Sequence, residues 1–452
     1  MGRLFGTDGV RGIANRELST EQAMRLGRAA ALVLGKALDR KPLFLIGFDT
    51  RASSPMLCAA VAAGVCSAGA DAIVLGVVPT PAVAFLVTHH GASAGVMISA
   101  SHNPSAYNGI KIFGGEGYKL PDELEQEIED LVLDQAPSDL PTDGEIGTIR
   151  IRHDSLAPYL AHIASAAETD LCGLSVAIDC ANGSASDCAE KLFTALGANV
   201  HMLHQAPNGT NINAACGSTN MEELAQYVVK NRLDCGLAFD GDADRFLAID
   251  ENGATVDGDR IMAICALDMK SQGKLPQNTV VGTVMTNFGF TRFCDENGIR
   301  FIATKVGDRF VLEEMLLGGY ALGGEQSGHV IFREFSTTGD GQLTALRLLS
   351  IMKKQQTSLS TLATVMTQYP QYTENLTVSP EGRLAFFTDL EIKSAIDSAR
   401  ELLGDAGRVV VRPSGTEPLI RVMAESMDDR LARAAVDSIA ATIRRRLGKD
   451  RV

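Results

Sequence analysis

The chain is marked first by what it lacks. Tryptophan is absent, and aromatic residues make up only 5% of the 452 residues. No Gly-Lys pair is followed by Ser or Thr, so the phosphate-binding P-loop is missing, and no Gly-x-Gly-x-x-Gly run follows an expected strand. A nucleotide-binding site is therefore not supported.

Targeting features and paired cysteines are missing as well. The opening residues, MGRLFGTDGVRG, contain no apolar core of the kind that a signal peptide needs. The most apolar run, 72–87, is too short for a membrane span and is interrupted by Pro79 and Pro81. The nine cysteines are odd in number and form no Cys-x-x-Cys pair, which predicts reduced core residues in a cytoplasmic protein.

Charge and length limit the classes further. The formal net charge of −14 argues against nucleic acid and against an anionic membrane as partners. A small anionic substrate stays compatible with this charge, provided that Arg and Lys side chains gather around it. A chain of 452 residues predicts two to four domains rather than one core.

Expected strands and helices alternate along most of the chain. Ser19, with Gln22 three residues later, predicts a helix start, and buried strands are expected at 43–47 and 72–77. This alternation is typical of α/β domains with a mainly parallel sheet covered on both faces. Residues 135–154 have the composition of a linker or of a crossing edge strand. We expect three consecutive mixed α/β sheet domains and a smaller α+β C-terminal domain around a central cleft, at 1–150, 151–255, 256–369 and 370–452.

The stretch 98–113, ISASHNPSAYNGIKIF, combines a serine with other reactive side chains. An apolar strand ends at Ile98, and Asn103 and Pro104 stop regular structure, which predicts an exposed loop. Ser101 lies on this loop beside a histidine, with Lys111 in the next strand. The arrangement suggests a nucleophile or a group carrier. Considered alone, the loop is equally compatible with an ordinary turn.

Three aspartates at alternate positions follow a strand expected at 234–239. Asp240, Asp242 and Asp244 offer hard oxygen donors, which suit Mg²⁺. An EF-hand loop would need glycine at its sixth position, where this chain has Arg245. The residues after it read as a strand rather than as a helix, so we interpret the run as a magnesium site of another kind.

Two further loops carry groups suited to phosphate or sugar. Residues 412–418, RPSGTEP, place hydroxyls and backbone N–H groups between two strands, with Arg412 and Arg421 on either side. A turn with incidental arginines is the alternative. Residues 323–329, GGEQSGH, hold Glu325, Ser327 and His329, which could bind sugar hydroxyls or shuttle a proton, although a strand-linking turn is equally compatible.

Together these loops provide a hydroxyl nucleophile, a metal site and a remote phosphate cradle. Phosphoryl transfer to and from a phosphorylated small molecule requires such a set. The four motifs SHNP, DGDADR, GEQSGH and RPSGT also occur in the order and spacing of the α-D-phosphohexomutases. The chain resembles that family along its whole length.

The resemblance implies a mechanism based on phosphoserine. Ser101 would carry a phosphate in the resting enzyme and join the three aspartates around one Mg²⁺ per chain. It would phosphorylate a hexose phosphate, give a 1,6-bisphosphate and take back the other phosphate. Arg11, His102 and Lys111 fit the family's positions for orienting groups and proton transfer, with Lys111 as the preferred base and His329 as the alternative. One departure is Phe48, where many relatives have arginine.

The resemblance also implies which residues bind the substrate. Glu325 and Ser327 would hold sugar hydroxyls, and the C-terminal domain would hold the phosphate that does not react. The full set of binding candidates is Arg245, Lys305, Gly307, Glu325, Ser327, Arg412, Ser414, Gly415, Thr416 and Arg421.

The sugar is the least determined part of this expectation. Gln326 beside Glu325 favours glucosamine phosphate, with glucosamine 1,6-bisphosphate as the intermediate, on the way to UDP-N-acetylglucosamine. Mannose and glucose phosphates are the alternative within the family. Outside it, a Mg²⁺-dependent phosphatase that acts through phosphoserine and a non-catalytic sugar-phosphate sensor stay open. A homodimer is compatible with the sequence.

Overall fold

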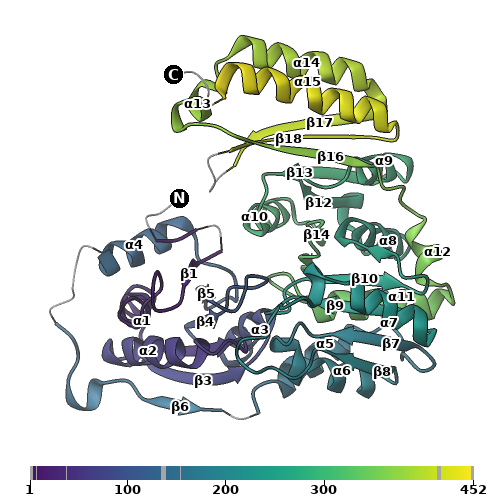
Figure 1. Ribbon diagram of the computed structural model, residues 1–452. Helices are drawn as coiled ribbons and strands as arrows, with labels where there is room; N and C mark the ends of the chain where they lie inside the picture. Colours follow the sequence, from purple (N-terminus) through teal and green to yellow (C-terminus); the bar gives the residue numbers. More distant parts are fainter. Residues whose placement is uncertain are drawn as a thin grey trace. The chain divides into compact units, whose positions relative to one another are not determined.

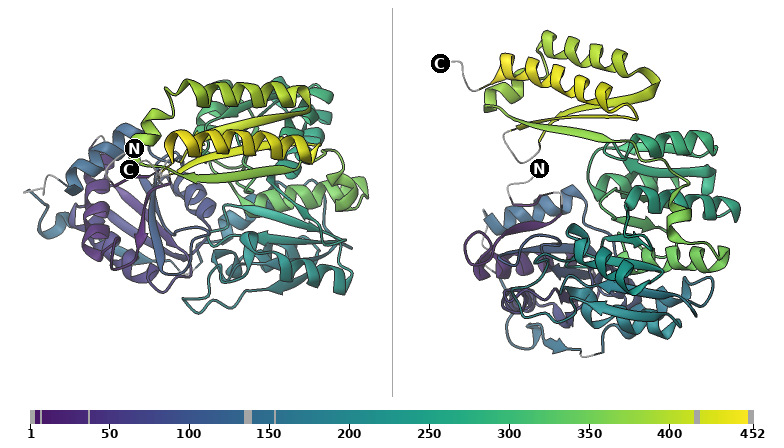
Figure 2. Two further views of the ribbon diagram at one scale, coloured as in Figure 1. Left: turned by 45° about the horizontal axis from the view of Figure 1, so that its top comes forward. Right: turned by 45° about the vertical axis from the view of Figure 1, so that its right-hand side comes forward.

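A computed structural model describes residues 4–6, 8–36, 38–133, 139–152, 154–414 and 419–448. The chain forms two compact units (Figures 1 and 2). The larger comprises residues 1–283 and 302–365, and the smaller comprises 284–301 and 366–452. None of the helices in the described ranges has the length and hydrophobicity of a membrane span.

The first sheet has six strands in the order β1-β5-β4-β2-β3-β6. Its centre is parallel, but β5 runs antiparallel to both of its neighbours, so the sheet is mixed. The chain passes from β4 into the Ser101 loop and returns along β5, which carries Lys111. The elements are β1 (Val10–Ile13), α1 (Thr20–Gly35), β2 (Leu43–Phe48), α2 (Ser54–Ser67), β3 (Asp71–Val77), α3 (Thr80–His90), β4 (Ala94–Ile98), β5 (Tyr107–Gly114), α4 (Asp122–Leu133) and β6 (Ile149–Ile151).

The second sheet has five strands in the order β11-β10-β9-β7-β8. Strands β7, β8 and β9 are parallel, and β10 returns antiparallel to β9 with Phe246 opposite Phe239. The aspartate loop is therefore the turn of a hairpin at the carboxyl end of a buried strand. The elements are α5 (Ala157–Ser165), β7 (Ser175–Asp179), α6 (Ala189–Ala195), β8 (Asn199–Leu203), α7 (Glu222–Asn231), β9 (Cys235–Phe239), β10 (Phe246–Asp250) and β11 (Thr255–Val256).

The third sheet has four strands in the order β13-β12-β14-β15. The glycine-rich loop 325–329 connects the antiparallel strands β14 and β15. The buried helix α11 follows β15 and packs on β9, β10 and β15, which joins the second and third sheets. The elements are α8 (Gly258–Ser271), β12 (Thr279–Thr283), β13 (Arg300–Thr304), α10 (Asp308–Gly318), β14 (Leu322–Gly324), β15 (Val330–Phe332), α11 (Gly341–Gln355) and α12 (Leu359–Ala363).

The smaller unit is an α+β layer of antiparallel strands in the order β16-β18-β17. Its apolar core lies between this sheet and the helices α14 and α15. Glu425 of β18 accepts hydrogen bonds from the backbone N–H of Phe288 and from Arg408 within the same unit. The elements are α9 (Phe288–Glu296), β16 (Gln371–Thr377), α13 (Pro380–Ala385), α14 (Leu390–Leu403), β17 (Gly407–Pro413), β18 (Leu419–Ser426) and α15 (Asp429–Leu447).

The predicted α/β class with a smaller α+β C-terminal domain is confirmed. Ser19 caps α1 by accepting from the N–H of Gln22. Of the two readings for 135–154, the edge strand is correct, because β6 pairs with β3. The expectation that cysteines lie in the core fails for Cys172, which is exposed, and holds for the other eight. The domain boundaries stay a prediction.

Candidate active site

Ser101 lies at the carboxyl end of β4, on a loop whose backbone is bound by the side chain of Arg51. The buried Arg51 guanidinium donates to four carbonyl oxygens at 2.5–3.0 Å, those of Ser101, Asn103, Pro104 and Tyr107. A planar guanidinium suits this task because its N–H groups point in fixed directions. Ser101 has a positive φ of 52°, which is strained for a residue with a side chain. Arg51 therefore helps to hold the serine in an unfavourable backbone conformation.

Asp49 ties this arrangement together. The buried carboxylate accepts from Arg51 Nε at 2.7 Å and from the hydroxyls of Ser54 and Ser99 at 2.7 Å each. Ser99 Oγ in turn accepts from the backbone N–H of Ser101 at 2.9 Å. The chain Asp49–Ser99–Ser101 fixes the amide N–H of the candidate nucleophile, while Arg51 binds its carbonyl oxygen.

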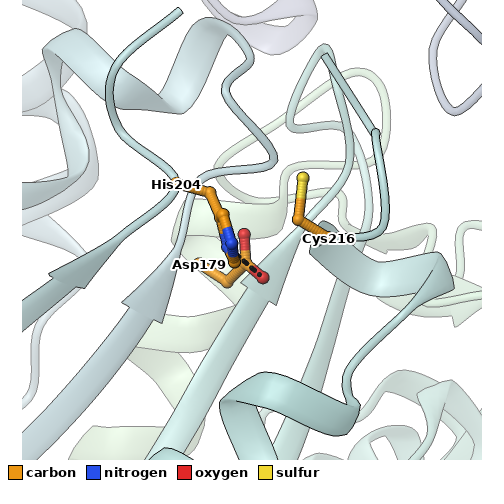
Figure 3. Close-up of side chains that lie close together, drawn as sticks. All are labelled: Asp179, His204 and Cys216. Carbon is orange, nitrogen blue, oxygen red and sulfur yellow. Dashed lines mark ion pairs between the residues drawn. The ribbon is translucent and has the colours of Figure 1, made fainter. Parts of the chain in front are cut away.

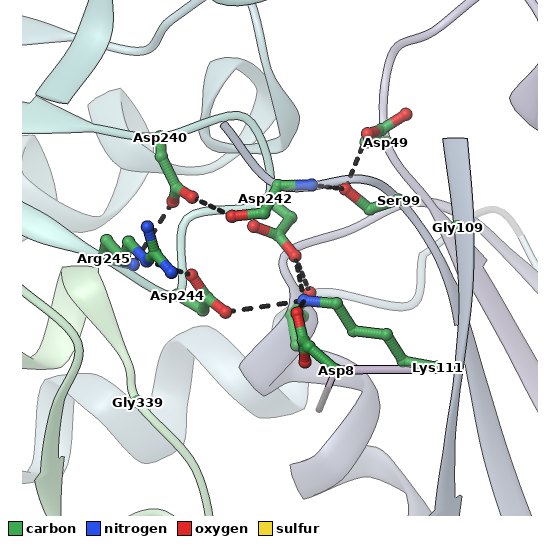
Figure 4. A network of polar contacts seen from close by, with 12 residues as sticks. Asp8, Asp49, Ser99, Gly109, Lys111, Asp240, Asp242, Asp244, Arg245 and Gly339 are labelled. Carbon is green, nitrogen blue, oxygen red and sulfur yellow. Dashed lines mark hydrogen bonds and ion pairs between the residues drawn. The ribbon is translucent and has the colours of Figure 1, made fainter. Parts of the chain in front are cut away.

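The three aspartates of the loop 240–244 lie close together, with Lys111 and Arg245 beside them (Figure 4). All three are buried, and an oxygen from each lies within 4.8 Å of the others. Ser101 Oγ donates to Asp240. Asp242 Oδ1 and Asp244 Oδ1 are buried and make no hydrogen bond to the described residues. Converging carboxylates with unused buried oxygens fit a divalent cation that prefers oxygen ligands, as predicted for Mg²⁺.

The electrostatics of the three carboxylates support the same conclusion. Burial raises the pKa of Asp240, and the nearby Asp244 and Asp242 raise it further. Burial also opposes ionisation of Asp244, but Lys111 and His329 outweigh it, so the pKa of Asp244 is lowered. Without a further cation, the site therefore disfavours a third negative charge. A divalent ion would remove that penalty.

Lys111 reaches the cluster from β5 and is itself buried. Its ammonium donates to Asp242 Oδ2 at 2.9 Å and lies 3.0 Å from Asp8 Oδ2 and 3.6 Å from Asp244 Oδ2. Burial opposes the charge, but the carboxylates of Asp242, Asp8 and Asp244 outweigh burial and raise the pKa of Lys111. A second lysine, Lys119, also contacts Asp8. Its Nζ lies 2.5 Å from Asp8 Oδ1 and 2.5 Å from Asp308 Oδ2.

His102 and two arginines lie beside the serine. His102 Nδ1 is 3.4 Å from Ser101 Oγ and 3.1 Å from Arg245 Nη1. Burial, Arg245 and Arg11 lower the pKa of His102 to about 4, so its imidazole is neutral at pH 7. Arg11 itself pairs with Asp8. The predicted residues Arg11, His102, Lys111 and Arg245 thus belong to one network with Ser101.

His329 approaches the same aspartates from the third sheet. Its Nδ1 lies 3.6 Å from Asp244 Oδ2, and its Nε2 accepts from the backbone N–H of Gly339 at 3.0 Å. Burial lowers the pKa of His329, but Asp244 and Asp308 outweigh it, and the net shift is upward. The imidazole is 2% exposed, so a proton could reach it only through groups inside the site.

The other sugar-binding candidates lie further along this sheet. Glu325 Oε1 accepts from the backbone N–H of Gly307 at 3.1 Å, which brings these two predicted residues together. Ser327 and Lys305 are exposed, and Lys305 Nζ lies 5.6 Å from the centre of the Phe310 ring. Glu325 therefore lies beside the start of α10, whereas no hydrogen bond joins the exposed Ser327 to that helix among the described residues.

The phosphate-binding candidates of the C-terminal motif belong to the smaller unit. Arg412 and Arg421 are directly opposite on the antiparallel strands β17 and β18. Burial and Arg421 lower the pKa of Arg412, as expected for adjacent like charges that an anion would relieve. Arg383 donates to the carbonyl oxygen of the buried Ser414 at 2.7 Å. Gly415 and Thr416 lie outside the described residues.

Several residues of these networks were missed by sequence reasoning. The sequence assigned no role to these residues, which are Asp8, Asp49, Thr80, Ser99, Lys119 and Arg383. Thr80 shows why: its hydroxyl donates to Asp242 Oδ2 at 2.6 Å across 162 positions of sequence. Asp8 and Asp49 do lie in polar loops that carry an arginine, at 6–12 (GTDGVRG) and 49–51 (DTR), but the polar character of these loops identifies no partner.

Four family models match this chain in order. They are described as Phosphoglucomutase/phosphomannomutase alpha/beta/alpha domain I, domain II and domain III and the C-terminal domain, and they match residues 2–138, 157–253, 257–369 and 377–442.

Individual relatives match over full length. The phosphoglucosamine mutase of Caldanaerobacter subterraneus subsp. tengcongensis is 52% identical, with 99% of this chain and 100% of the relative covered. That of Rhodococcus erythropolis is 51% identical, with 98% and 99% covered. Among solved structures, a phosphoglucomutase/phosphomannomutase family protein from Burkholderia thailandensis has a TM-score of 0.82 at 23% identity, with 97% of both chains covered. The N-acetylphosphoglucosamine mutase of Aspergillus fumigatus, solved with GlcNAc-6P and magnesium, has a TM-score of 0.67 at 18% identity, with 98% and 95% covered.

Proposed function

The chain belongs to the α-D-phosphohexomutase family, that of the phosphoglucomutases and phosphomannomutases, and we propose that it interconverts glucosamine 6-phosphate and glucosamine 1-phosphate. The observation that carries this proposal is the Ser101 hydroxyl hydrogen-bonded to Asp240 inside a buried cluster of three aspartates. The amino sugar is taken from the phosphoglucosamine mutases that share about half of their residues with this chain.

In the proposed reaction Ser101 stores a phosphoryl group between turnovers. A sugar hydroxyl attacks the phosphorus of phosphoserine, the new sugar O–P bond forms and the Ser101 Oγ–P bond breaks. The hydroxyl proton leaves the sugar and is returned to Ser101 Oγ. The product, glucosamine 1,6-bisphosphate, reorients, and the reverse step moves its other phosphoryl group to Ser101. No phosphate is gained or lost over the cycle.

We assign the metal to Asp240, Asp242 and Asp244, with the phosphate of Ser101 as a further oxygen ligand. Mg²⁺ fits best, because all the donors are hard oxygens. Such an ion would neutralise negative charge on the transferring phosphoryl group. The chain's own contribution is to hold the serine still: Arg51 and Ser99 bind its backbone, and Lys111 and Arg245 supply positive charge beside it.

The proton acceptor is proposed from contacts and charge. To act as a base, Lys111 would have to lose a proton that three neighbouring carboxylates stabilise. We therefore assign Lys111 the role of a charged ammonium that orients the phosphate. His329 has the alternative role of base, since Asp244 and Asp308 would stabilise the imidazolium that forms when it accepts a proton. The neutral imidazole of His102 and the guanidinium of Arg11 are assigned the role of orienting the groups around Ser101 Oγ.

Substrate contacts complete the proposal. Glu325 and Ser327, with Gly307 and Lys305 nearby, would bind the sugar hydroxyls and must do so in both orientations of the bisphosphate. Arg412, Ser414 and Arg421, together with Gly415 and Thr416, would bind the phosphate that does not react. Arg383 joins this set through its bond to Ser414.

One experiment tests the proposal directly. Intact mass of the purified protein should show one phosphate that Ser101→Ala removes, and the wild type should interconvert the two glucosamine phosphates faster than mannose or glucose phosphates. The Ser101→Ala variant should lose on the order of 10⁴-fold or more in kcat/KM, as expected when a nucleophile is removed. Steady release of inorganic phosphate would identify a phosphatase instead, and binding without turnover would identify a sensor.

A further inference from the structure

A second group of metal-ligating side chains lies at the same edge of the five-stranded sheet, apart from the aspartate loop. Asp179 ends β7, His204 follows β8, and Cys216 precedes the short helix at Gly217–Thr219 (Figure 3). One oxygen, nitrogen or sulfur atom of each residue lies within 4.8 Å of the others. The mechanism above uses none of them.

The contacts within this group leave ligand atoms available. Asp179 accepts one hydrogen bond on each oxygen, from the backbone N–H groups of Ala181 and Gly217, which leaves a lone pair on each. His204 Nδ1 and Asp179 Oδ2 form an ion pair at 3.1 Å (Figure 3), but the two atoms do not have the geometry of a hydrogen bond. A nitrogen and an oxygen at this separation without a linear hydrogen bond match two ligands of one tetrahedral ion, whose metal–ligand distances are about 2.0–2.2 Å.

The backbone around the group is held in an unusual form. His204 adopts a positive φ of 47°, and Cys216 is followed by Gly217 at a φ of 72°. A β-carbon at Gly217 would lie 2.6 Å from the carbonyl oxygen of Phe239, so the chain passes too close to β9 for any other residue. The positive φ of His204 is strained for a residue with a side chain, and such strain is kept where the surroundings fix a functional geometry.

We propose that Asp179, His204 and Cys216 form a second metal site, which takes a transition-metal ion of the zinc type. Thiolate and imidazole donors select Zn²⁺ over Mg²⁺, whereas carboxylate oxygens alone suit Mg²⁺ and do not discriminate in favour of Zn²⁺ in this way. Cys216 and Asp179 are fully buried, and His204 is 22% exposed in its side chain, which leaves a route of entry for the ion. Glu223 Oε2, 3.3 Å from His204 Nε2, lies at this exposed side.

The site would fasten both ends of the loop between His204 and Cys216. That loop supports the nucleophile near its second end, since Asn213 Nδ2 donates to the carbonyl oxygens of Ser101 at 2.9 Å and Asn103 at 3.1 Å. The Gly209 carbonyl also accepts from the N–H of Ala52. A zinc-type ion would therefore stiffen a segment that holds the Ser101 loop, without touching the substrate.

A protonated histidine between two carboxylates is the competing explanation. Asp179 raises the pKa of His204, which favours its protonated form, and burial raises the pKa of the Cys216 thiol to about 12, so the thiol of a metal-free protein is protonated at pH 7. Zinc-type ions bind the deprotonated groups and displace these protons. The two explanations therefore differ in what is bound, which can be measured directly.

The test uses the full-length protein stripped with a chelator and returned to excess Mg²⁺. After addition of Zn²⁺ and gel filtration, we expect one zinc per chain by elemental analysis. Co²⁺ in its place should give a thiolate-to-cobalt absorption band. Cys216→Ser and His204→Asn should each weaken zinc binding by at least about 10–100-fold, the loss known even for partners outside the ligand set. The matched controls are Cys172→Ser, an exposed thiol, and Asp240→Asn in the other cluster, and both should keep the ion and the cobalt band.

Three results would overturn the proposal. They are the absence of retained zinc, retention unchanged in both Cys216→Ser and His204→Asn, and loss in Asp240→Asn alone, which would place the zinc on the carboxylate cluster. Far-UV circular dichroism and the melting temperature of each metal-free variant separate a lost ligand from a lost fold. If Cys216→Ser fails to fold, the His204→Asn result and the cobalt band of the wild type still decide.

Discussion

Two clusters at one edge of the same sheet differ in almost every chemical respect. Asp240, Asp242 and Asp244 follow β9, and Asp179 and His204 follow β7 and β8, because the carboxyl ends of parallel strands share an edge. The first cluster contains oxygen donors only and faces the cations of Lys111 and Arg245. The second mixes oxygen, nitrogen and sulfur, and its carboxylate is bound by backbone N–H groups.

The two clusters differ in whether the charge around them changes during the reaction. It changes at the three aspartates and stays constant at Asp179, His204 and Cys216. A reacting phosphoryl group brings and removes negative charge, and the carboxylates of the first cluster are accordingly paired with the cations of Lys111 and Arg245. Backbone donors, in contrast, fix Asp179 in one position, which suits a site that only holds the chain together. The topology of the sheet supplies both locations, and the side chains decide their use.

The largest effect should come from breaking the carboxylate cluster. Asp242→Asn should lower kcat/KM by about 10³-fold or more, because it removes a ligand and the partner of both Lys111 and Thr80. Cys216→Ser should lower it by less than tenfold. The assay is steady-state turnover of glucosamine 6-phosphate with both variants checked for folding. Equal losses in the two variants would mean that the clusters do not differ in function.

Metal removal should separate the clusters by ion type. Chelator treatment should abolish turnover, and Mg²⁺ should restore it, because three carboxylates prefer a hard cation. Zn²⁺ added alone should raise the melting temperature without restoring the rate. The measurement pairs an activity titration with thermal unfolding for each ion. Full recovery of turnover with Zn²⁺ in the absence of Mg²⁺ would contradict the assignment of the two ions.

A smaller loss is expected from Arg51→Lys, which leaves both clusters intact. A lysine cannot reach four carbonyl oxygens and Asp49 together, so the Ser101 loop should relax. We expect kcat to fall by about 10–100-fold while KM for the sugar phosphate changes little, since misorientation affects the reacting serine and not the sugar contacts. Arg28→Lys, which removes a guanidinium bond to Ser67 elsewhere in the first domain, is the control. A change in KM alone would exclude a positioning role.

Sequence reasoning predicted the α/β class because alternating apolar strands and capped helices are local features. The aspartate run was also identified for a local reason, since Asp240, Asp242 and Asp244 are neighbours in the chain. The cluster of Asp179, His204 and Cys216 spans 37 positions and was not predicted. Only the parallel pairing of β7, β8 and β9 brings these three together, and their spacing follows no metal motif.

The C-terminal unit shows the same limit. The sequence predicted a small α+β domain with two strands, one on either side of RPSGTEP, which are β17 and β18, but β16 and α14 were missed, although α14 is an amphipathic helix capped by Asp389. Strand β16 alternates exposed and half-buried residues, so little apolar pattern marks it. Arg383 lies in this missed region. Its bond to Ser414 depends on the fold of α13 and not on any spacing.

The smallest effect concerns a buried carboxylate that belongs to neither cluster. Asp340 caps α11 through the N–H of Leu343 and accepts from Tyr159 Oη at 2.9 Å. Burial raises its pKa from 3.8 to about 6, so its contribution to stability is present below pH 3.8 and is lost as the pH rises through 6. Asp340→Asn, which cannot ionise, should be more stable than the wild type at pH 8. This advantage should shrink by about 2–3 kcal/mol between pH 8 and pH 4 in urea unfolding.

The matched control for this carboxylate has the opposite sign. Hydrogen bonds to Thr148 and Lys41 outweigh the burial of Asp71 and lower its pKa, so its contribution is present above pH 3.8 and is lost as the pH falls further. Asp71→Asn should therefore be less stable than the wild type at pH 8, and the gap should close in acid. The contrary outcome is that Asp340→Asn behaves like Asp71→Asn and is less stable than the wild type at pH 8. That result would mean that burial does not disfavour the ionised carboxylate of Asp340. The case for a cation among the three buried aspartates would then lose its electrostatic basis.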